Sequence, residues 1–191
     1  MYPKYQTDAL VLGGKDVGEA DRSIVLYTED FGLIRARVSA IRKENSKMRY
    51  ALQNFSRCRV GLIRGARGWR AVGAMTLTSF HAATESGVKA YARLARLVVR
   101  LIGGEEKNDY LFEVLVEAHR ALTAPLCASW RTIELISVAR ILYALGYLSP
   151  EALEAALFTH TAYTGDSLEQ AEVLRPALLS KVNRAIGETH L

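Results

Sequence analysis

The spacing of apolar residues changes near residue 80 of this 191-residue chain. Before that point, apolar and polar residues alternate in short runs separated by glycines, which is the pattern of half-buried β-strands. After residue 87, apolar residues recur every three or four positions over stretches long enough to form amphipathic helices. Strands are expected at residues 8–14, 23–32, 33–41, 55–65 and 69–79, and the main helices at residues 88–102, 110–122 and 129–148.

Local signals indicate where the later helices begin. Residues 149–151, Ser-Pro-Glu, have the order of an N-cap, a proline at N1 and an acid in the first turn. They predict a short helix that runs through Phe158. Ser167 and Gln170 match a capping box for a last helical region. Pro176 falls inside that region, and because proline breaks a helix interior, it is expected to begin a new helix.

A short helix is expected between the third and fourth strands, and this order of elements is the layout of an OB barrel. That fold is a frequent holder of single-stranded nucleic acid. The sequence therefore predicts an α+β protein with two domains. Residues 1–80 are expected to form an N-terminal five-stranded OB-fold β-barrel and residues 81–191 an α-helical domain, with residues 80–87 as the connection.

Positive charge is concentrated in the first of these parts. Residues 1–80 carry fourteen Lys or Arg against seven Asp or Glu, although the whole chain has a net charge of only +5. Within residues 33–73 there are eleven basic residues and one acid, Glu44. Such segregation indicates an anionic partner for the first part, and nucleic acid is the commonest one.

Strand alternation predicts which way the arginines point. Arg35 and Arg37 share one face of the third strand, opposite Ile34, Ala36 and Val38. The fourth strand repeats the pattern, with Arg57 and Arg59 opposite an apolar face formed by Cys58, Val60 and Leu62. A solvated polar face is the ordinary explanation for one such strand. Two strands that both use arginine, with almost no intervening acid, favour one basic surface.

The stretch RKENSKMRYALQNF, residues 42–55, connects those two strands and holds four basic side chains against one carboxylate. Ser46 is expected to cap a short helix whose inner side carries Met48 and Leu52. Lys47 and Arg49 would then point away from the core. Basic residues near a helix N-terminus oppose its dipole, whereas a bound phosphate would reverse that effect.

Three aromatic residues are candidates for stacking on bases. Tyr50 and Phe55 flank the expected short helix, and Trp69 lies in a glycine-flanked turn between Arg67 and Arg70. An aromatic residue beside a strand is more often part of the core, so both roles stay open for Tyr50 and Phe55. The predicted nucleic-acid-binding residues are Arg35, Arg37, Arg42, Lys43, Lys47, Arg49, Arg57, Arg59, Tyr50 and Trp69.

No catalytic or metal-binding pattern is present, so neither an enzyme nor a cofactor is expected. The two cysteines, Cys58 and Cys127, have no Cys-x-x-Cys spacing, and the four histidines have no ligand partner at a useful distance along the chain. His119 is expected to be a partly exposed helical residue. There is no apolar run of bilayer length and no signal-peptide pattern, so a cytoplasmic location without membrane contact is expected.

The first 80 residues resemble the N-terminal domain of the RecO family of bacterial recombination mediators. The resemblance rests on the order and spacing of several short elements. They are Gly18-Glu19, Asp21-Arg22, LYTEDFG at residues 26–32, Ile41-Arg42-Lys43 with Ser46, and Leu52-Gln53-Asn54-Phe55. The expected helix that ends in ALGYLSP is similar to one in the family's C-terminal domain.

The resemblance implies a DNA repair protein that binds single- and double-stranded DNA and anneals complementary strands. It also implies that the protein works with RecR and the single-stranded DNA-binding protein to load the recombinase. Arg35, Arg37, Arg42, Lys43 and Lys47 fall where the family places DNA-contacting basic residues. Many relatives carry a four-cysteine zinc site after the Leu-Gly-Tyr helix, whereas this chain has no cysteine after Tyr147 and a shorter second domain.

Two other functions remain compatible with the sequence. One is an interaction adaptor whose helical domain, through Arg131 and Arg140, docks the acidic, apolar tail of the single-stranded DNA-binding protein. In that case DNA contact would be secondary. The other is an RNA-binding OB protein, since charge and fold do not distinguish the two nucleic acids.

Overall fold

The computed structural model describes residues 2–80, 83–124, 127, 129–149 and 155–189. Internal contacts divide the chain into two compact units. The first, called here the barrel unit, is Met1–His81 with Ala95–Asn108, and the second, the helical unit, is Ala82–Leu94 with Asp109–Leu191. The sequence pattern had suggested a single division after residue 80, whereas contacts also assign part of the following helix and loop to the barrel unit.

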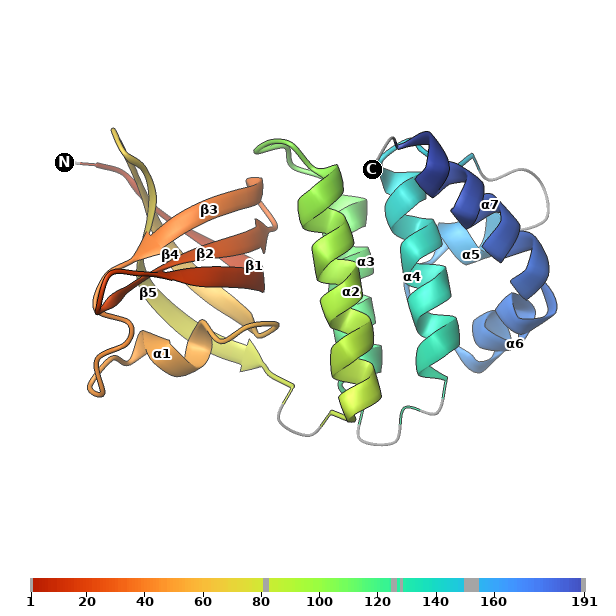
Figure 1. Cartoon of the computed structure of the whole chain (residues 1–191), viewed down its shortest axis with the longest axis horizontal. Helices are drawn as coiled ribbons and strands as arrows, with labels where there is room; N and C mark the ends of the chain where they lie inside the picture. The colour runs from red at the N-terminus through yellow and green to blue at the C-terminus, as the bar shows by residue number, and fades with distance from the viewer. Residues whose placement is uncertain (1, 81–82, 125–126, 128, 150–154, 190–191) are drawn as a thin grey trace. The chain divides into compact units, whose positions relative to one another are not determined.

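Five strands close into a barrel in the order β1-β2-β3-β5-β4 (Figure 1). All neighbours are antiparallel except β3 and β5, which are parallel. With helix α1 between β3 and β4, this arrangement confirms the predicted OB fold. The strands are β1 (Lys4–Val17), β2 (Asp21–Thr28), β3 (Gly32–Val38), β4 (Arg57–Gly65) and β5 (Gly68–Thr78).

The barrel closes because β1 pairs with two different strands. Its first half, from Lys4 to Leu10, lies against β4, and the part from Ala9 to Val17 lies against β2. The register shifts between Val11 and Gly13, at the point where β1 passes from one partner to the other. Gly14 follows, and a Cβ there would lie 2.7 Å from the Ser23 carbonyl oxygen. A side chain at this position would therefore force the β1–β2 pair apart.

The barrel interior is apolar and well buried, as the alternation predicted. Ile34, Ala36 and Val38 of β3 face inward and are at most 1% exposed. Cys58, Val60 and Leu62 of β4 are fully buried in the same cluster, and burial raises the pKa of the Cys58 thiol to about 12. The thiol is therefore an inert apolar group at neutral pH.

Helix α1 (Met48–Ala51) lies at one end of the barrel (Figure 1). Leu52 is fully buried and Met48 packs against the core, so the predicted inner side is confirmed. The expected cap at Ser46 is wrong. Lys47 occupies the N-cap position in a helical conformation, and no side chain caps the helix. The Ser46 amide instead donates to the Lys43 carbonyl in a preceding turn, so the chain is already curved there.

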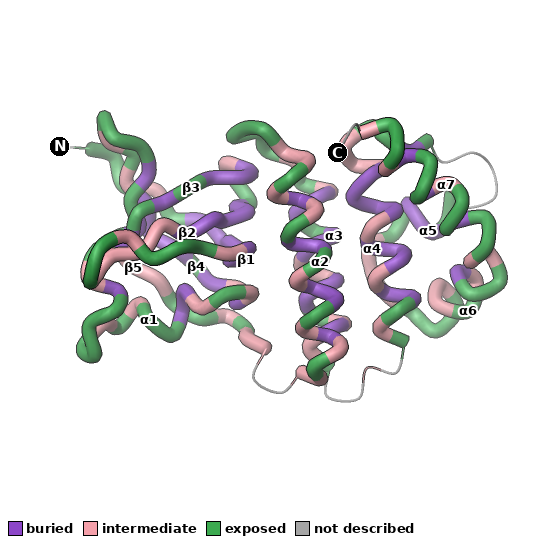
Figure 2. The backbone as a smooth tube through the Cα atoms, viewed as in Figure 1, coloured by how far each residue is buried: buried purple, intermediate pink, exposed green. Residues whose placement is uncertain are grey.

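The helices follow the predicted order, and Figure 2 shows most of the buried positions of the helical unit along α3 and α4. The predicted helices at residues 88–102 and 110–122 match α2 and α3. The helix predicted at residues 129–148 corresponds to α4, which ends at Ala144, because Gly146 adopts φ +78° just after it. The helices are α2 (Glu85–Leu101), α3 (Asp109–Leu122), α4 (Trp130–Ala144), α5 (Ala155–Thr159), α6 (Gly165–Val173) and α7 (Arg175–Glu188).

The helix starts are partly as predicted. Pro176 lies in the first turn of α7, which confirms its expected role. A capping box exists at α6, but Thr164 is its N-cap and Ser167 its third position, so the predicted box was placed three residues too late. The proposed start at residues 149–151 lies partly outside the described residues. None of the described helices combines the length and apolar character needed to span a bilayer.

Two side chains expected at the surface of the helical unit are buried in it. His119 is 1% exposed and makes an edge-on contact with the Tyr91 ring. Arg140, on α4, is also 1% exposed. Its guanidinium donates to the carbonyl oxygens of Leu157, Thr161 and His160 at 2.7, 2.6 and 2.5 Å. One cation therefore satisfies three backbone acceptors in α5 and the segment that follows it.

We expect Arg140→Met to lower the free energy of unfolding of the helical unit by roughly 3 kcal/mol, because three carbonyl groups lose their donor. Hydrogen exchange should show the loss of amide protection concentrated at residues 155–163. Arg131→Met is the matched control, since Arg131 is exposed and lies over the Trp130 ring. Equal protection in both variants would contradict this role for Arg140.

Candidate nucleic-acid interface

The predicted arginines face outward, but they do not form one patch on adjacent strands. Arg35, Arg37 and Arg59 are exposed and Arg57 is half-buried. In the closed barrel β5 lies between β3 and β4, so the two pairs of arginines are separated. The neighbour of Arg37 across the parallel pair is Arg70 of β5.

The arginines of β4 are matched by a carboxylate from β1. Asp8 lies directly opposite Arg59 in the β1–β4 ladder, and its side chain is only 10% exposed. Arg59 Nε lies 2.7 Å from one carboxylate oxygen, and Arg57 Nη2 lies 3.3 Å from the other. Because a buried carboxylate needs such partners, Arg57 and Arg59 are held in a structural role.

Arg37, one of the two outward-facing arginines of β3, is also in an ion pair. Asp21, at the start of β2, accepts hydrogen bonds from Arg37 Nε and Nη2 at 3.0 and 2.6 Å. It also accepts one from the Ala40 amide at 2.9 Å. The Ala40 amide and the Arg37 guanidinium together lower the pKa of Asp21 below its ordinary value. The carboxylate therefore stays ionised at neutral pH, and it offsets the charge of Arg37.

Four predicted basic residues have no such partner. The side chains of Arg35, Lys43, Lys47 and Arg49 are exposed, and in the described part of the chain none has an ion pair or hydrogen bond. They follow one another from β3 through the loop at residues 39–47 into α1, and we call them the basic strip. Arg42 is exposed but partly paired, because its guanidinium is 3.6 Å from Asp16 and donates to the Gly18 carbonyl at 3.2 Å.

The aromatic candidates have different surroundings. Tyr50, on α1 beside the basic strip, is 68% exposed and available for stacking. Phe55 is half-buried, and its ring meets that of Phe80 edge-on at 6.3 Å.

The prediction that Trp69 stacks on bases is wrong. Its side chain is 4% exposed within the barrel core, where its ring contacts those of Tyr5 and Phe31. The indole Nε1 donates to Glu105 at 3.0 Å. Neither its faces nor its donor is free for a ligand.

A cavity of about 340 Å³ opens beside the basic strip. Three guanidinium groups and one carboxylate line it, together with a buried apolar residue. Arg22 is the member of this set that the sequence interpretation missed, since it was considered only as the neighbour of Asp21. The lining residues are Asp16, Arg22, Ile41, Arg42 and Arg49.

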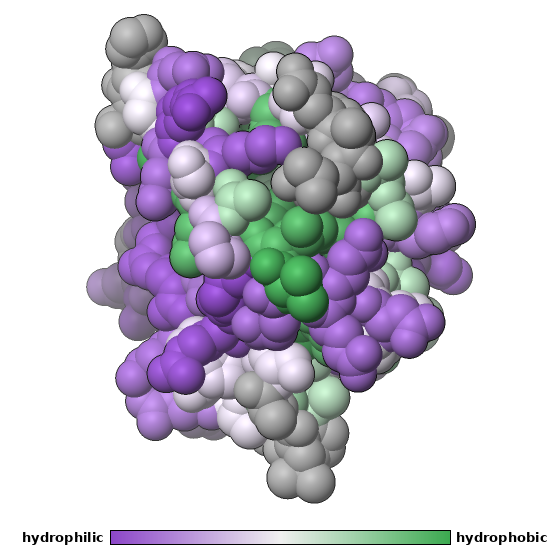
Figure 3. Space-filling view, turned by 90° about the vertical axis from the view of Figure 1, so that its right-hand side faces the viewer, coloured by the Kyte–Doolittle hydropathy of each residue, from purple (hydrophilic) through white to green (hydrophobic). Residues whose placement is uncertain are grey.

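The helical unit has an apolar groove of about 310 Å³ between α4 and α7. Arg131, Glu134 and Arg175 also line it; Arg175 is paired with Glu172 at 2.8 Å, and Glu134 is paired with Arg93. Arg140, predicted to act at such a surface, is buried and unavailable. Figure 3, which looks onto the α5–α7 side of this unit, shows an apolar area framed by hydrophilic residues. The apolar lining of the groove is Leu135, Val138, Leu179, Val182 and Ile186.

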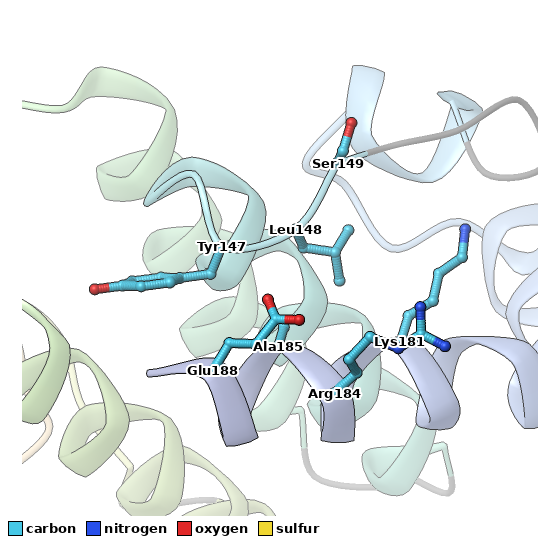
Figure 4. Close-up of a pocket in the computed structure, with 7 residues that line it drawn as sticks. All are labelled: Tyr147, Leu148, Ser149, Lys181, Arg184, Ala185 and Glu188. Carbon is cyan, nitrogen blue, oxygen red and sulfur yellow. The ribbon is translucent and has the colours of Figure 1, made fainter. Parts of the chain in front are cut away.

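A smaller cavity of about 180 Å³ lies where the segment after α4 passes α7 (Figure 4). Lys181 and Arg184 contribute positive charge and Glu188 negative charge. Across the described residues, no three His, Cys, Asp or Glu side chains come together in a way that could hold a metal ion.

Comparison with known proteins identifies the barrel. A family model described as "Recombination protein O N terminal" matches residues 1–80. The DNA repair protein RecO of Pelotomaculum thermopropionicum is 34% identical over 122 residues, which is 62% of this chain and 47% of that protein. Residues 1–80 form a domain of the RecO N-terminal family.

Other RecO proteins extend the match. That of Gloeothece citriformis is 32% identical over 124 residues, covering 64% of this chain and 44% of its own length. One from a Dehalococcoides mccartyi strain is 28% identical over 159 residues, covering 80% and 60%. The similarity to RecO therefore continues beyond the barrel into the helices. The chain spans about half the length of the curated relatives it matches.

Proposed function

We propose that this protein acts in DNA repair and recombination by binding single- and double-stranded DNA along the basic strip and annealing complementary strands. The relatives it matches are DNA repair proteins by name. The observation that carries the proposal is the unmatched charge of Arg35, Lys43, Lys47 and Arg49, which face solvent next to an exposed tyrosine. Unpaired basic side chains on an OB barrel suit the backbone of a flexible strand.

The mechanism needs no bond-making step. Lysine and arginine contacts to phosphates release counterions and hold the backbone, while the bases remain available for pairing. The same positive charge reduces the repulsion between two strands that are brought together. Tyr50 adds a stacking face, which is worth roughly 1 to 3 kcal/mol per base when used. We therefore propose a binding protein and not an enzyme.

The partners that fit this role are RecR and the single-stranded DNA-binding protein, with no membrane partner. In the proposed sequence of events, the protein anneals or remodels DNA coated by the single-stranded DNA-binding protein, and it helps to load recombinase there. This part of the proposal rests on the similarity of the chain to RecO proteins.

The triple variant Arg35→Ala, Lys43→Ala, Lys47→Ala tests the basic strip. Each lost phosphate contact lowers the salt dependence of single-strand binding by about 0.7 in log K against log salt. We expect the slope to fall by about 2 in the variant, as measured by fluorescence anisotropy with a labelled oligonucleotide. An RNA oligonucleotide of matched sequence, measured in parallel, separates a DNA-binding from an RNA-binding role.

The control is Lys89→Ala, Arg120→Ala, Arg184→Ala, which removes the same charge from exposed positions of the helical unit. Its slope should stay close to that of the wild type. Equal losses in the two triple variants would show that only net charge matters, and the basic strip would then have no special role.

The groove between α4 and α7 favours a second candidate function, a protein-interaction adaptor. Its lining combines apolar residues with Arg131, Glu134 and Arg175. Glu134 and Arg175 are both in ion pairs, so Arg131 remains to attract an acidic peptide with an apolar anchor. The occupant we propose is the acidic tail of the single-stranded DNA-binding protein. Leu179 is 41% exposed in this groove, so part of the apolar surface is accessible.

Leu179→Glu should weaken binding of a synthetic acidic tail peptide by more than about tenfold, because it adds a like charge to the groove. Val173→Glu is the matched control, since Val173 is 81% exposed and is not among the groove-lining residues. The triple variant of the basic strip should bind the peptide normally. Unchanged peptide affinity in Leu179→Glu would exclude the groove as the docking site.

A further inference from the structure

The cavity beside the basic strip is built from four separate segments of the barrel unit. Asp16 comes from β1 and Arg22 from β2, while Ile41 and Arg42 lie in the loop after β3 and Arg49 lies on α1. Asp16 and Arg22 face each other across the β1–β2 ladder. Closure of the barrel and attachment of α1 therefore bring three guanidinium groups to one opening, with a single carboxylate beside them.

The parts of this cavity are held in place before any ligand arrives. The main-chain amide of Arg42 donates to the Ala20 carbonyl at 3.1 Å, and its guanidinium donates to the Gly18 carbonyl at 3.2 Å. Asp16 lies 3.6 Å from Arg42 Nε. Ile41 is 3% exposed and is the apolar residue of the lining. The arginine that binds the carboxylate is thus Arg42, which leaves the other two for a ligand.

Arg22 has donor capacity that the protein does not use. Its Nη2 donates to Asn54 Oδ1 at 2.6 Å, which fixes the direction of the side chain. Its Nε is buried and has no hydrogen-bond acceptor among the described residues. Because Nε is closed off from solvent, the donor that remains for a ligand is Nη1, which makes no hydrogen bond with the described residues.

Arg49, on α1, is the third arginine of the lining. It is exposed on α1 and has no partner in the described part of the chain. With Asp16 offsetting one of the three arginines, the lining keeps a charge of about +2, which suits a doubly or singly charged anion. The volume of about 340 Å³ is roughly ten times that of one water molecule, so a phosphate with its hydration fits.

We infer that this cavity binds a single phosphate group, with Arg22 and Arg49 as its main donors and Arg42 as a third. Guanidinium groups present paired donors that match phosphate oxygens. The lining has no aromatic residue and only one apolar one, so it recognises the phosphate and not a base. Identification of nucleic acid as the source of that phosphate rests on the proposed function, whereas the site itself rests on the cavity.

A DNA strand contains two kinds of phosphate group that fit this cavity. A 5′-terminal phosphate carries up to two negative charges, and an internal phosphodiester carries one. Anisotropy measurements with a short oligonucleotide, prepared with and without its 5′-phosphate, distinguish them. A larger effect of Arg49→Gln on the phosphorylated strand assigns the site to the terminus, and an equal effect assigns it to an internal phosphate.

The test uses the full chain with Arg22→Gln and Arg49→Gln. We expect each substitution to reduce oligonucleotide affinity by roughly tenfold, which corresponds to the loss of one charge-assisted contact. Lys15→Gln is the control, because Lys15 is exposed on β1 next to Asp16 but does not line the cavity. It should change affinity less than about twofold. If Arg22→Gln does not fold, Arg49→Gln still tests the site, because Arg49 is at the surface.

A second measurement separates this inference from the proposed function. Titration of inorganic phosphate alone, followed by calorimetry, should show one saturable site in the wild type and in Lys15→Gln, and affinity about tenfold lower in Arg49→Gln. If the wild type binds inorganic phosphate but not oligonucleotide, the phosphate site stands and its nucleic-acid source is excluded. If both arginine variants match Lys15→Gln toward both ligands, the inference is overturned even when DNA binding remains.

Discussion

The pairing of β1 with both β2 and β4 is the constraint on which the charge distribution of this protein depends. It closes the barrel, and it also brings the acidic residues of β1 next to arginines that are remote in sequence. Asp8 reaches Arg57 and Arg59, while Asp16 reaches Arg42. The bulge between Val11 and Gly13 fixes which of these carboxylates faces which partner strand. A shift of one residue would turn Asp8 to the other face of the sheet and remove these ion pairs.

As a result, arginines with similar sequence patterns have different roles in the structure. Those on β4 stabilise a buried carboxylate, and Arg37 on β3 is bound by Asp21. Among the predicted binding residues, the charge that stays unpaired lies on Arg35 of β3, on Lys43 and Lys47 of the following loop, and on Arg49 of α1. Because binding to phosphates requires charge that is not already paired, the barrel presents a narrower basic surface than its composition suggests.

Much of the fold was predictable because it depends on local patterns. Alternation in β3 and β4 gave the correct inner and outer faces, and Pro176 marked the start of α7. The same alternation applied to β5 places Trp69 with Ala71 on the inner face, which would have avoided its assignment to a surface turn. The exposed residues of the basic strip were also found from sequence.

What could not be predicted depends on contacts between distant segments. Counting acids within residues 33–73 missed Asp8, Asp16 and Asp21, which come from outside that window but lie beside its arginines in space. Arg140 was expected at the surface, but it is buried against carbonyl groups of α5 and the following segment. These acceptors lie seventeen to twenty-one positions away in the sequence, so the local pattern around Arg140 does not reveal them. Arg22 was missed for a similar reason, since its cavity joins four segments.

In the proposed binding mode, ion pairing decides which arginines contact DNA. The side-chain Nε–Hε signals of the arginines in nuclear magnetic resonance spectra test this as single-stranded oligonucleotide is added to the full chain. We expect large shifts for Arg35 and Arg49 and almost none for Arg57 and Arg59. Shifts as large at Arg57 and Arg59 as at Arg35 would contradict it.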